Sequence, residues 1–311
     1  MIIEVSILIP VLNGWQFTET CLRTLFKHMP SHWRPNEDFE VIVFDDGSVD
    51  LTKSRLEEYE RDNSVKVLRG NGKGNFAKNN NRMAQIARGD WLCLLNNDTE
   101  LTENWLQPLL AHAQNSNVSL GVVGNIHVSP DRRTVNHAGI VFDDEGRPSH
   151  LYEGLPVNTP GVQSNRTMQA VTAACCLVSR KCFIELRGFD DQYVNGFEDV
   201  DFCLRARKLN WEIGLCGDSV IVHHGSSTPG RFASETRNRE RYQDKWRGHV
   251  QPDIDLIPKL EGVLWPDRSM MYLILRSITR FPVVGQIIRC SVNTTYGIRL
   301  RQAIHRRASR V

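Results

Sequence analysis

The sequence predicts an α/β fold with a mainly parallel central sheet flanked by helices. Apolar strand-like runs alternate with helical patterns through the N-terminal part of the chain. The runs lie at 5–9, 40–44, 65–68 and 91–95, and the helical patterns at 16–29, 51–62 and 76–88. Runs without polar alternation are typical of strands buried on both faces, as in a parallel sheet. With 311 residues and 41% hydrophobic content, the chain is long enough to build such a core.

Beyond residue 118 the pattern becomes less regular. Shorter apolar pieces are followed by a polar segment at 143–168, whose length is typical of a functional or mobile loop. The sequence then predicts helices at 200–209 and 234–247, strands at 212–216 and 219–223, and a linker with three prolines at 251–266. A basic helical C-terminal extension is expected to follow the linker.

The net charge of +2 conceals an uneven distribution. After Asp267 the chain has nine arginines and neither Asp nor Glu, so residues 268–311 carry +9 and residues 1–267 carry −7. A basic tail on an acidic body favours contact with an anionic partner such as a membrane surface, while a solvated or oligomer-packing pair of helices is the alternative. The apolar stretch 270–278 is too short to span a bilayer, although it could lie on one.

The cysteines and the N-terminus indicate the expected compartment. Eight cysteines show no Cys-x-x-Cys spacing, so no zinc cluster is expected. Several lie in apolar runs, where free thiols commonly pack. The chain starts with a strand pattern rather than with the charged and apolar regions of a secretory leader. We therefore expect a reducing, cytoplasmic location, with peripheral contact at the inner face of the membrane as an option.

The predicted strand at 40–44 ends in two carboxylates, Asp45 and Asp46, followed by Gly47. Ligands bind at the carboxyl ends of the strands in parallel sheets, so these side chains could accept hydrogen bonds from a ribose or a nucleobase. The alternative is an Asp-Gly turn that also caps the next helix.

A second polar cluster, Asn96, Asn97 and Asp98, follows the predicted strand that ends just before it. A carboxylate with a carboxamide beside it could supply oxygen ligands to Mg²⁺ or Mn²⁺, whose other ligands would come from a diphosphate and water. An ordinary Asx turn is the alternative. His223 ends a later strand and could add a nitrogen ligand. Whether it or His224 does so stays open, because neighbouring strand residues point to opposite faces.

A Gly- and Asn-rich stretch at 70–75 looks like a phosphate cradle, but it has neither the P-loop nor the dinucleotide-binding fingerprint. Neither motif is therefore assigned. Lys78 and Arg82 lie one turn apart on the predicted helix that follows, where they could face a diphosphate or point to solvent.

Three carboxylates crowd into four positions at Glu198, Asp199 and Asp201. Such a cluster is typical of a site of proton transfer, in which one carboxylate acts as a general base. It is also typical of a helix start, because Asp and Glu favour the exposed backbone amides of a first turn.

Seven segments, in this order, together resemble the inverting glycosyltransferases of family 2, which have the nucleotide-sugar-binding fold called GT-A. The segments are Val5–Asn13, Val43–Asp50, Asn75–Asn81, Leu94–Glu100, Gly188–Asp191, Phe197–Arg205 and Val222–Ser227. Each is common alone, whereas the ordered set is specific. The most similar subgroup is that of bacterial rhamnosyltransferase-like enzymes that build surface polysaccharides.

The resemblance implies a role for each matching residue. Asp199 corresponds to the general base, with Glu198 beside it, and Asp46 to the residue that contacts the base or ribose. Asp98 corresponds to the last residue of the family's Asp-x-Asp metal motif, in which Asn96 replaces the first aspartate. His223 corresponds to a metal-ligating histidine of some members. The other residues expected to bind the nucleotide-sugar are Pro10, Asn13, Asn75, Lys78, Asn81 and Asn97.

The resemblance also implies a domain division and an activity. Residues 1–117 would form the nucleotide-sugar-binding half, 118–250 the acceptor and catalytic half, and 251–311 a linker and basic extension. The implied activity is metal-dependent transfer, with Mn²⁺ or Mg²⁺, of a sugar from a nucleoside-diphosphate donor to a hydroxyl of a glycan or lipid-linked acceptor. No nucleic acid partner is expected. Two alternatives stay open: a hydrolase with Asp199 and Asp98 as an acid-base pair, and a catalytically silent sugar- or lipid-binding subunit of a polysaccharide assembly complex.

Overall fold

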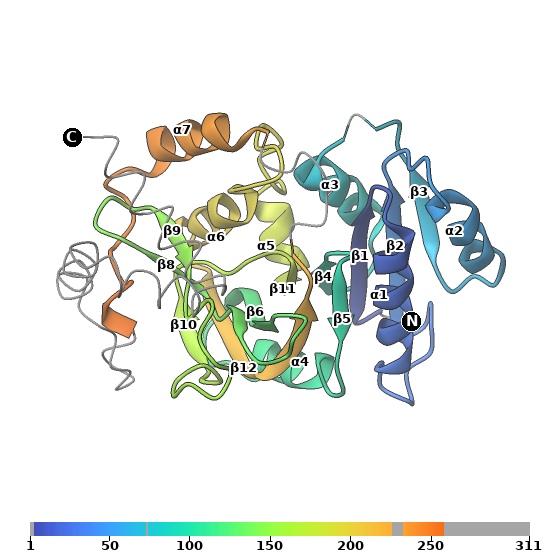
Figure 1. Ribbon diagram of the computed structural model, residues 1–311, viewed down its shortest axis with the longest axis horizontal. Coiled ribbons are helices and arrows are strands. Elements are labelled where there is room, and N and C mark those ends of the chain that lie inside the picture. Colours follow the sequence, from blue (N-terminus) through green and yellow to red (C-terminus); the bar gives the residue numbers. More distant parts are fainter. Residues whose placement is uncertain (1–2, 73, 226–232, 258–311) are drawn as a thin grey trace, which may run out of the picture.

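One continuous mixed β-sheet with helices on both faces forms the centre of the molecule (Figure 1). The computed structural model describes residues 3–72, 74–225 and 233–257. The strands follow the order β10 (Arg166–Met168), β12 (Glu212–His223), β6 (Leu120–Val128), β11 (Cys175–Ser179), β4 (Trp91–Leu95), β1 (Val5–Val11), β2 (Phe39–Asp45) and β3 (Lys66–Arg69). Short strands β5 (Thr99–Leu101) and β7 (Val135–His137) pair with β12 and β6, and β8 (Ile140–Phe142) forms a separate hairpin with β9 (Pro148–His150). The predicted α/β class is confirmed.

The N-terminal strands form the parallel part of this sheet. β1 pairs in parallel with β2 and with β4, and β2 pairs in parallel with β3. β11 is antiparallel to both β4 and β6, so it joins this part to the parallel pair β6 and β12. Because β1, β2 and β4 run in the same direction, the polar residues that follow them gather at one edge of the sheet.

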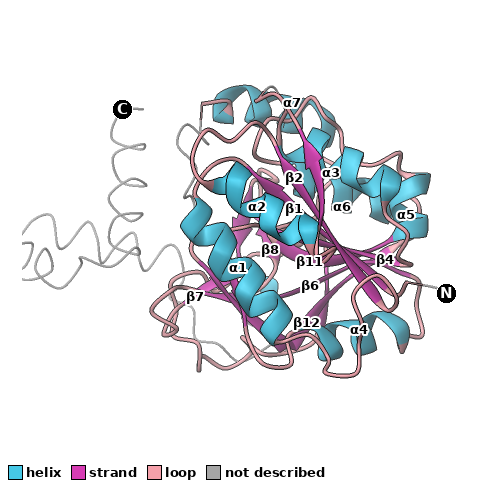
Figure 2. Cartoon of the chain, turned by 90° about the vertical axis from the view of Figure 1, so that its right-hand side faces the viewer, coloured by secondary structure: helices cyan, strands magenta, loops and turns pink. Residues whose placement is uncertain are grey.

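Two hydrophobic cores lie on the two faces of the sheet. Alternate residues of β1 divide between them, since Ile7 and Ile9 belong to one core and Leu8 to the other. Helices α1 (Trp15–Lys27), α2 (Thr52–Arg61) and α4 (Leu106–Gln114) contribute to the first core. Helices α3 (Phe76–Ile86), α5 (Arg180–Glu185), α6 (Glu198–Lys208) and α7 (Glu235–Trp246) contribute to the second (Figure 2).

Some elements differ from the sequence prediction. The two strands expected at 212–216 and 219–223 are one strand, β12, with a register shift against β6 between Cys216 and Val220. Helix α6 begins at Glu198 rather than at residue 200, which places the acidic cluster in its first turn. The polar segment 143–168 contains β9 and β10, so part of it is built into β-structure.

The start of the predicted linker is bound to the domain. The backbone N–H groups of Asp253 and Ile254 donate to the carbonyl of Phe142, and the N–H of Phe142 donates to Asp253 Oδ1 at 2.7 Å. Residues 258–311, and with them the predicted basic extension, lie outside the described residues. Within the described ranges, the helices all lack the length and apolar character needed to cross a bilayer.

Candidate active site

A pocket opens at the carboxyl ends of β1, β2 and β4. Its lining includes eight of the predicted site residues: Pro10, Asp46, Asn75, Asn96, Asn97, Asp98, Glu198 and Asp199. The other lining residues are Val11, Leu12, Gly74, Phe76, Asn79, Thr172, Ala173, Ala174 and Asn195. Four predicted residues, Asn13, Lys78, Asn81 and His223, lie outside this lining. The pocket therefore brings the polar strand ends and the start of α6 to one place.

Asp98 and His223 form a buried pair beside the pocket. Asp98 Oδ1 lies 3.3 Å from His223 Nε2, and the two residues are 8% and 6% exposed. His223 Nδ1 lies 3.1 Å from the side-chain oxygen of Asn136. Because that oxygen only accepts, Nδ1 carries the hydrogen, so in the neutral form of the ring Nε2 would direct a lone pair at the carboxylate. Two acceptor atoms that face each other in this way are suited to sharing a cation.

The donor set fits a divalent ion that is also held by a substrate. In the described part of the chain, no group of three or more His, Cys, Asp or Glu side chains could hold a metal ion. Asp98 and His223 could supply two protein ligands, and Asn96, which lines the same pocket, offers a carboxamide oxygen. A site with few protein ligands leaves positions for phosphate oxygens and water, as is usual for Mg²⁺.

Glu198 and Asp199 occupy the first turn of α6, where the exposed amides of the helix favour negative charge. Asp199 Oδ2 accepts the N–H of Ala173 at 3.2 Å, and Oδ1 accepts the N–H of Val200 at 2.8 Å. Glu198 is 7% exposed, and its Oε2 accepts the N–H of Gly196 at 2.6 Å. Asp199 is only half-buried, so it is the more accessible of the two carboxylates.

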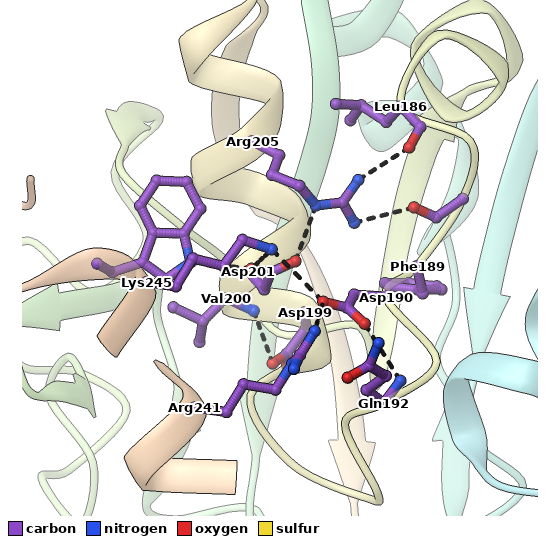
Figure 3. A network of polar contacts seen from close by, with 12 residues as sticks. Leu186, Phe189, Asp190, Gln192, Asp199, Val200, Asp201, Arg205, Arg241 and Lys245 are labelled. Carbon is purple, nitrogen blue, oxygen red and sulfur yellow. Dashed lines mark hydrogen bonds and ion pairs between the residues drawn. The ribbon is translucent and has the colours of Figure 1, made fainter. Parts of the chain in front are cut away.

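Asp201, the third carboxylate of the cluster, does not belong to the pocket lining and connects α6 to α7 (Figure 3). It is fully buried. Its oxygens contact Arg205 at 2.8 Å, Lys245 at 2.7 Å and the indole N–H of Trp246 at 2.9 Å. The acidic run therefore combines two roles, because its first two residues face the pocket and its last one braces the helix that carries them.

Asp46, which is predicted to contact the nucleotide, lies under the Gly-rich stretch. It is 5% exposed, and its carboxylate accepts the N–H of Gly72 at 3.2 Å and the amide of Asn79 at 3.3 Å. A Cβ atom at Gly74 would lie 2.5 Å from Asp46 Oδ2, and one at Gly70 would lie 2.4 Å from Oδ1. The glycines are thus required because the backbone passes directly over this carboxylate.

Asn13 and Asn97 hold the loops that surround the pocket. The side-chain oxygen of Asn13 accepts the N–H of Val49 at 2.8 Å, and its backbone N–H donates to Ser48 Oγ at 2.7 Å. These bonds join the loop after β1 to the loop after β2. Asn97 lines the pocket while its amide donates to Thr18 Oγ1 on α1 at 2.9 Å.

Asn75 and Asn81 connect α3 to the segment that leads into α6. Asn75 Oδ1 caps α3 by accepting the N–H of Lys78, and its amide donates to the carbonyls of Asp191 and Tyr193. Asn81 exchanges two hydrogen bonds, both of 2.9 Å, with the backbone of Phe189. Lys78 itself is exposed. These two asparagines therefore position residues 189–193 through hydrogen bonds to the backbone.

Several residues of the site were not predicted from the sequence. They are Asn79, which supports Asp46; Asn136, which orients His223; and Asn195 and Thr172–Ala174, which line the pocket. None of them lies directly at the end of a predicted strand or in an acidic cluster. Their contacts join residues that are distant in the sequence, so only the three-dimensional structure reveals them.

This architecture, a mixed α/β sheet with the pocket at its strand ends, defines the GT-A class of nucleotide-sugar transferase folds. The sequence allows a closer assignment. The chain belongs to glycosyl transferase family 2, whose family model matches residues 6–213. The family and the GT-A fold that the sequence motifs predict are both confirmed.

Individual relatives support this assignment. The O-antigen biosynthesis protein RfbC of Myxococcus xanthus is 30% identical over 231 residues, which cover 72% of this chain and 18% of that protein. The matched region makes up 18% of RfbC and 26% of another curated relative. This chain therefore spans about a quarter of the length of these relatives or less.

Solved structures show the same fold. A crystal structure of GalNAc-T7 with UDP, GalNAc and Mn²⁺ matches with a TM-score of 0.61 at 16% identity, covering 84% of this chain and 54% of that one. The mannosyltransferase PcManGT from Pyrobaculum calidifontis, in complex with GDP-Man and Mn²⁺, matches with a TM-score of 0.58 at 13% identity, covering 99% and 81%.

Proposed function

We propose that this protein is a metal-dependent inverting glycosyltransferase that moves a sugar from a nucleoside-diphosphate donor to a hydroxyl of a glycan or lipid-linked acceptor. One observation carries the proposal: the carboxylate of Asp98, paired with His223, and the carboxylate of Asp199 lie at the same pocket, at the carboxyl ends of the sheet. The GDP-Man and Mn²⁺ of one structural neighbour, and the UDP, GalNAc and Mn²⁺ of another, support the same conclusion.

Asp98 and His223 would hold Mn²⁺ or Mg²⁺, with Asn96 beside them. When bound, such an ion neutralises the charge on a leaving diphosphate. Asn136 keeps His223 in the tautomer that leaves Nε2 available, which is the usual effect of an outer partner on a metal-ligating histidine.

Asp199 is proposed to act as the general base. Its two N–H donors, from Ala173 and Val200, orient the carboxylate. The carboxylate removes the proton from an acceptor hydroxyl as the oxygen attacks the anomeric carbon of the donor sugar. The bond from that carbon to the diphosphate breaks on the opposite face, so a single displacement inverts the configuration. Pro10, Asp46 and Asn75 would lie toward the nucleotide.

The acceptor is proposed to belong to a surface polysaccharide, as the similarity to RfbC supports.

The predicted basic extension adds a second element to this proposal. Its nine arginines would hold the enzyme at an anionic membrane, where a lipid-linked acceptor is found. Deletion of residues 268–311 is therefore expected to weaken cosedimentation with anionic vesicles. Equal binding of the full and shortened chains would refute this role of the extension.

The central experiment measures binding and slow hydrolysis of UDP-, GDP- and dTDP-sugars with Mn²⁺ or Mg²⁺, for the wild type and for Asp199→Asn. We expect one donor to bind in the presence of metal. The substitution should lower its turnover about a thousandfold and leave its affinity unchanged, because a general base acts on the rate.

The opposite results separate the alternatives. Turnover that survives in Asp199→Asn would show that another group, such as Glu198, takes the proton. If no nucleotide-sugar binds with either metal, the transferase proposal is refuted, and a silent subunit that binds sugar or lipid becomes the better description.

A further inference from the structure

A row of four histidines, of which all but His150 are buried, lies beside the pocket. The ring of His127 is 5.4 Å from that of His223 and 5.1 Å from that of His137, and the ring of His150 is 4.9 Å from that of His137. His127 and His137 are fully buried. The row thus begins at the proposed metal ligand and extends across β6 and β7 to β9.

The hydrogen bonds of His137 determine its tautomer. Its Nε2 accepts two backbone N–H groups, from Gly139 at 3.2 Å and from Thr172 at 3.4 Å. This nitrogen must therefore be unprotonated, so the hydrogen is on Nδ1, which donates to His150 Nδ1 at 2.8 Å. Burial also lowers the pKa of His137 well below its ordinary value, which keeps the ring neutral.

The backbone segment that His137 holds also contacts the active site on both sides. The N–H of Ala173, the residue after Thr172, donates to Asp199 Oδ2 at 3.2 Å. The carbonyl of Ala174 accepts the N–H of Asn96 at 2.8 Å. Residues 172–174 thus lie between the proposed base and the loop that carries Asp98, and all three line the pocket.

We propose that His137 is a positioning residue for this reaction: by accepting the N–H of Thr172, it fixes residues 172–174 so that Ala173 orients the carboxylate of Asp199. The proposal rests on the transferase function given above. Without an acceptor at Nε2, the N–H of Thr172 would lose its partner and the segment would shift. A small displacement of a base lowers the rate of proton transfer much more than it lowers the affinity for the donor.

Two substitutions at the same position provide the test. In His137→Gln, the side-chain oxygen can take the place of Nε2, whereas in His137→Asn the shorter side chain cannot reach the N–H of Thr172. We expect kcat to fall about tenfold or more in His137→Asn, with the KM for the donor within about twofold of the wild type. His137→Gln should keep most of the wild-type kcat. His112→Asn, on the distant helix α4, is a matched control that should leave both constants unchanged.

A second variant covers the case in which His137→Asn does not fold. Thr172 Oγ1 accepts the N–H of Ala174 at 3.3 Å, so Thr172→Ala loosens the same segment while His137 is intact. It should also lower kcat more than it changes the KM for the donor. Equal kcat values in His137→Asn, His137→Gln and the wild type would overturn the proposal, as would an unchanged kcat in Thr172→Ala. A wild type without any turnover would instead refute the transferase function on which the proposal depends.

Discussion

The proposed nucleotide side and the proposed catalytic side of the pocket are built in different ways. On the nucleotide side, Asp46 and Asp98 follow almost directly after β2 and β4, so the strand ends themselves bring them together. On the catalytic side, Asp199 is held by Ala173, and its helix is fixed through Asp201 to Lys245 of α7. The positions of Asp46 and Asp98 thus depend on the direction of the strands that precede them. The position of Asp199 depends on contacts between segments that are distant in the sequence. Substitutions far from the pocket should therefore affect the catalytic side more.

The largest effect is expected at the Asp98 and His223 pair, where a residue that follows β4 meets the last residue of the distant strand β12. Asp98→Ala should lower turnover by roughly 10²- to 10³-fold, because it removes the carboxylate that would hold the ion at the diphosphate. Asn136→Ala should have a smaller effect, about tenfold, since Asn136 only orients His223. Turnover measured against Mn²⁺ concentration checks both variants. Activity that withstands both a chelator and Asp98→Ala would show that this pair is not a metal site.

The next effect sharpens the comparison within the acidic cluster itself. Asp201→Asn should lower the free energy of unfolding by about 2 kcal/mol, because it leaves Arg205 and Lys245 without their buried carboxylate. Asp199→Asn should change the same quantity by less than about 1 kcal/mol, since Asp199 is half-buried and lies at the pocket. Urea unfolding of both variants is the measurement. A larger loss of stability in Asp199→Asn would reverse the roles given to the two carboxylates.

The contrast between the two sides also explains what could be predicted from the sequence. The strands before Asp46 and Asp98 are short apolar runs followed by helical patterns, so their order and their common edge follow from local periodicity. The family and the GT-A fold followed from seven motifs that lie at these and later positions. The single strand β12 was not predicted, because Gly217 and Asp218 interrupt its apolar pattern at the register shift against β6.

The supports of the site could not be predicted, for a physical reason. Asn75 and Asn81 lie in a family motif, yet their side chains bind the backbone of residues 189–193. Asn136 and His137 act through similar contacts, with His223 and Thr172. Hydrogen bonds to distant backbone groups leave no periodic signal in the sequence, so these residues are recognised only after the chain has folded.

The smallest expected effect is on the stability of the catalytic side at acidic pH. Burial lowers the pKa of His137 well below the ordinary value of 6.5. Below about pH 6.5 the unfolded chain therefore binds a proton at this histidine that the folded chain does not bind. The free energy of unfolding consequently falls with falling pH, by at most about 1.4 kcal/mol per pH unit for this residue. Urea unfolding between pH 7.5 and about 5.5 should thus show a steeper loss of stability in the wild type than in His137→Gln, which cannot titrate. Equal slopes would show that His137 is not held neutral in the folded chain.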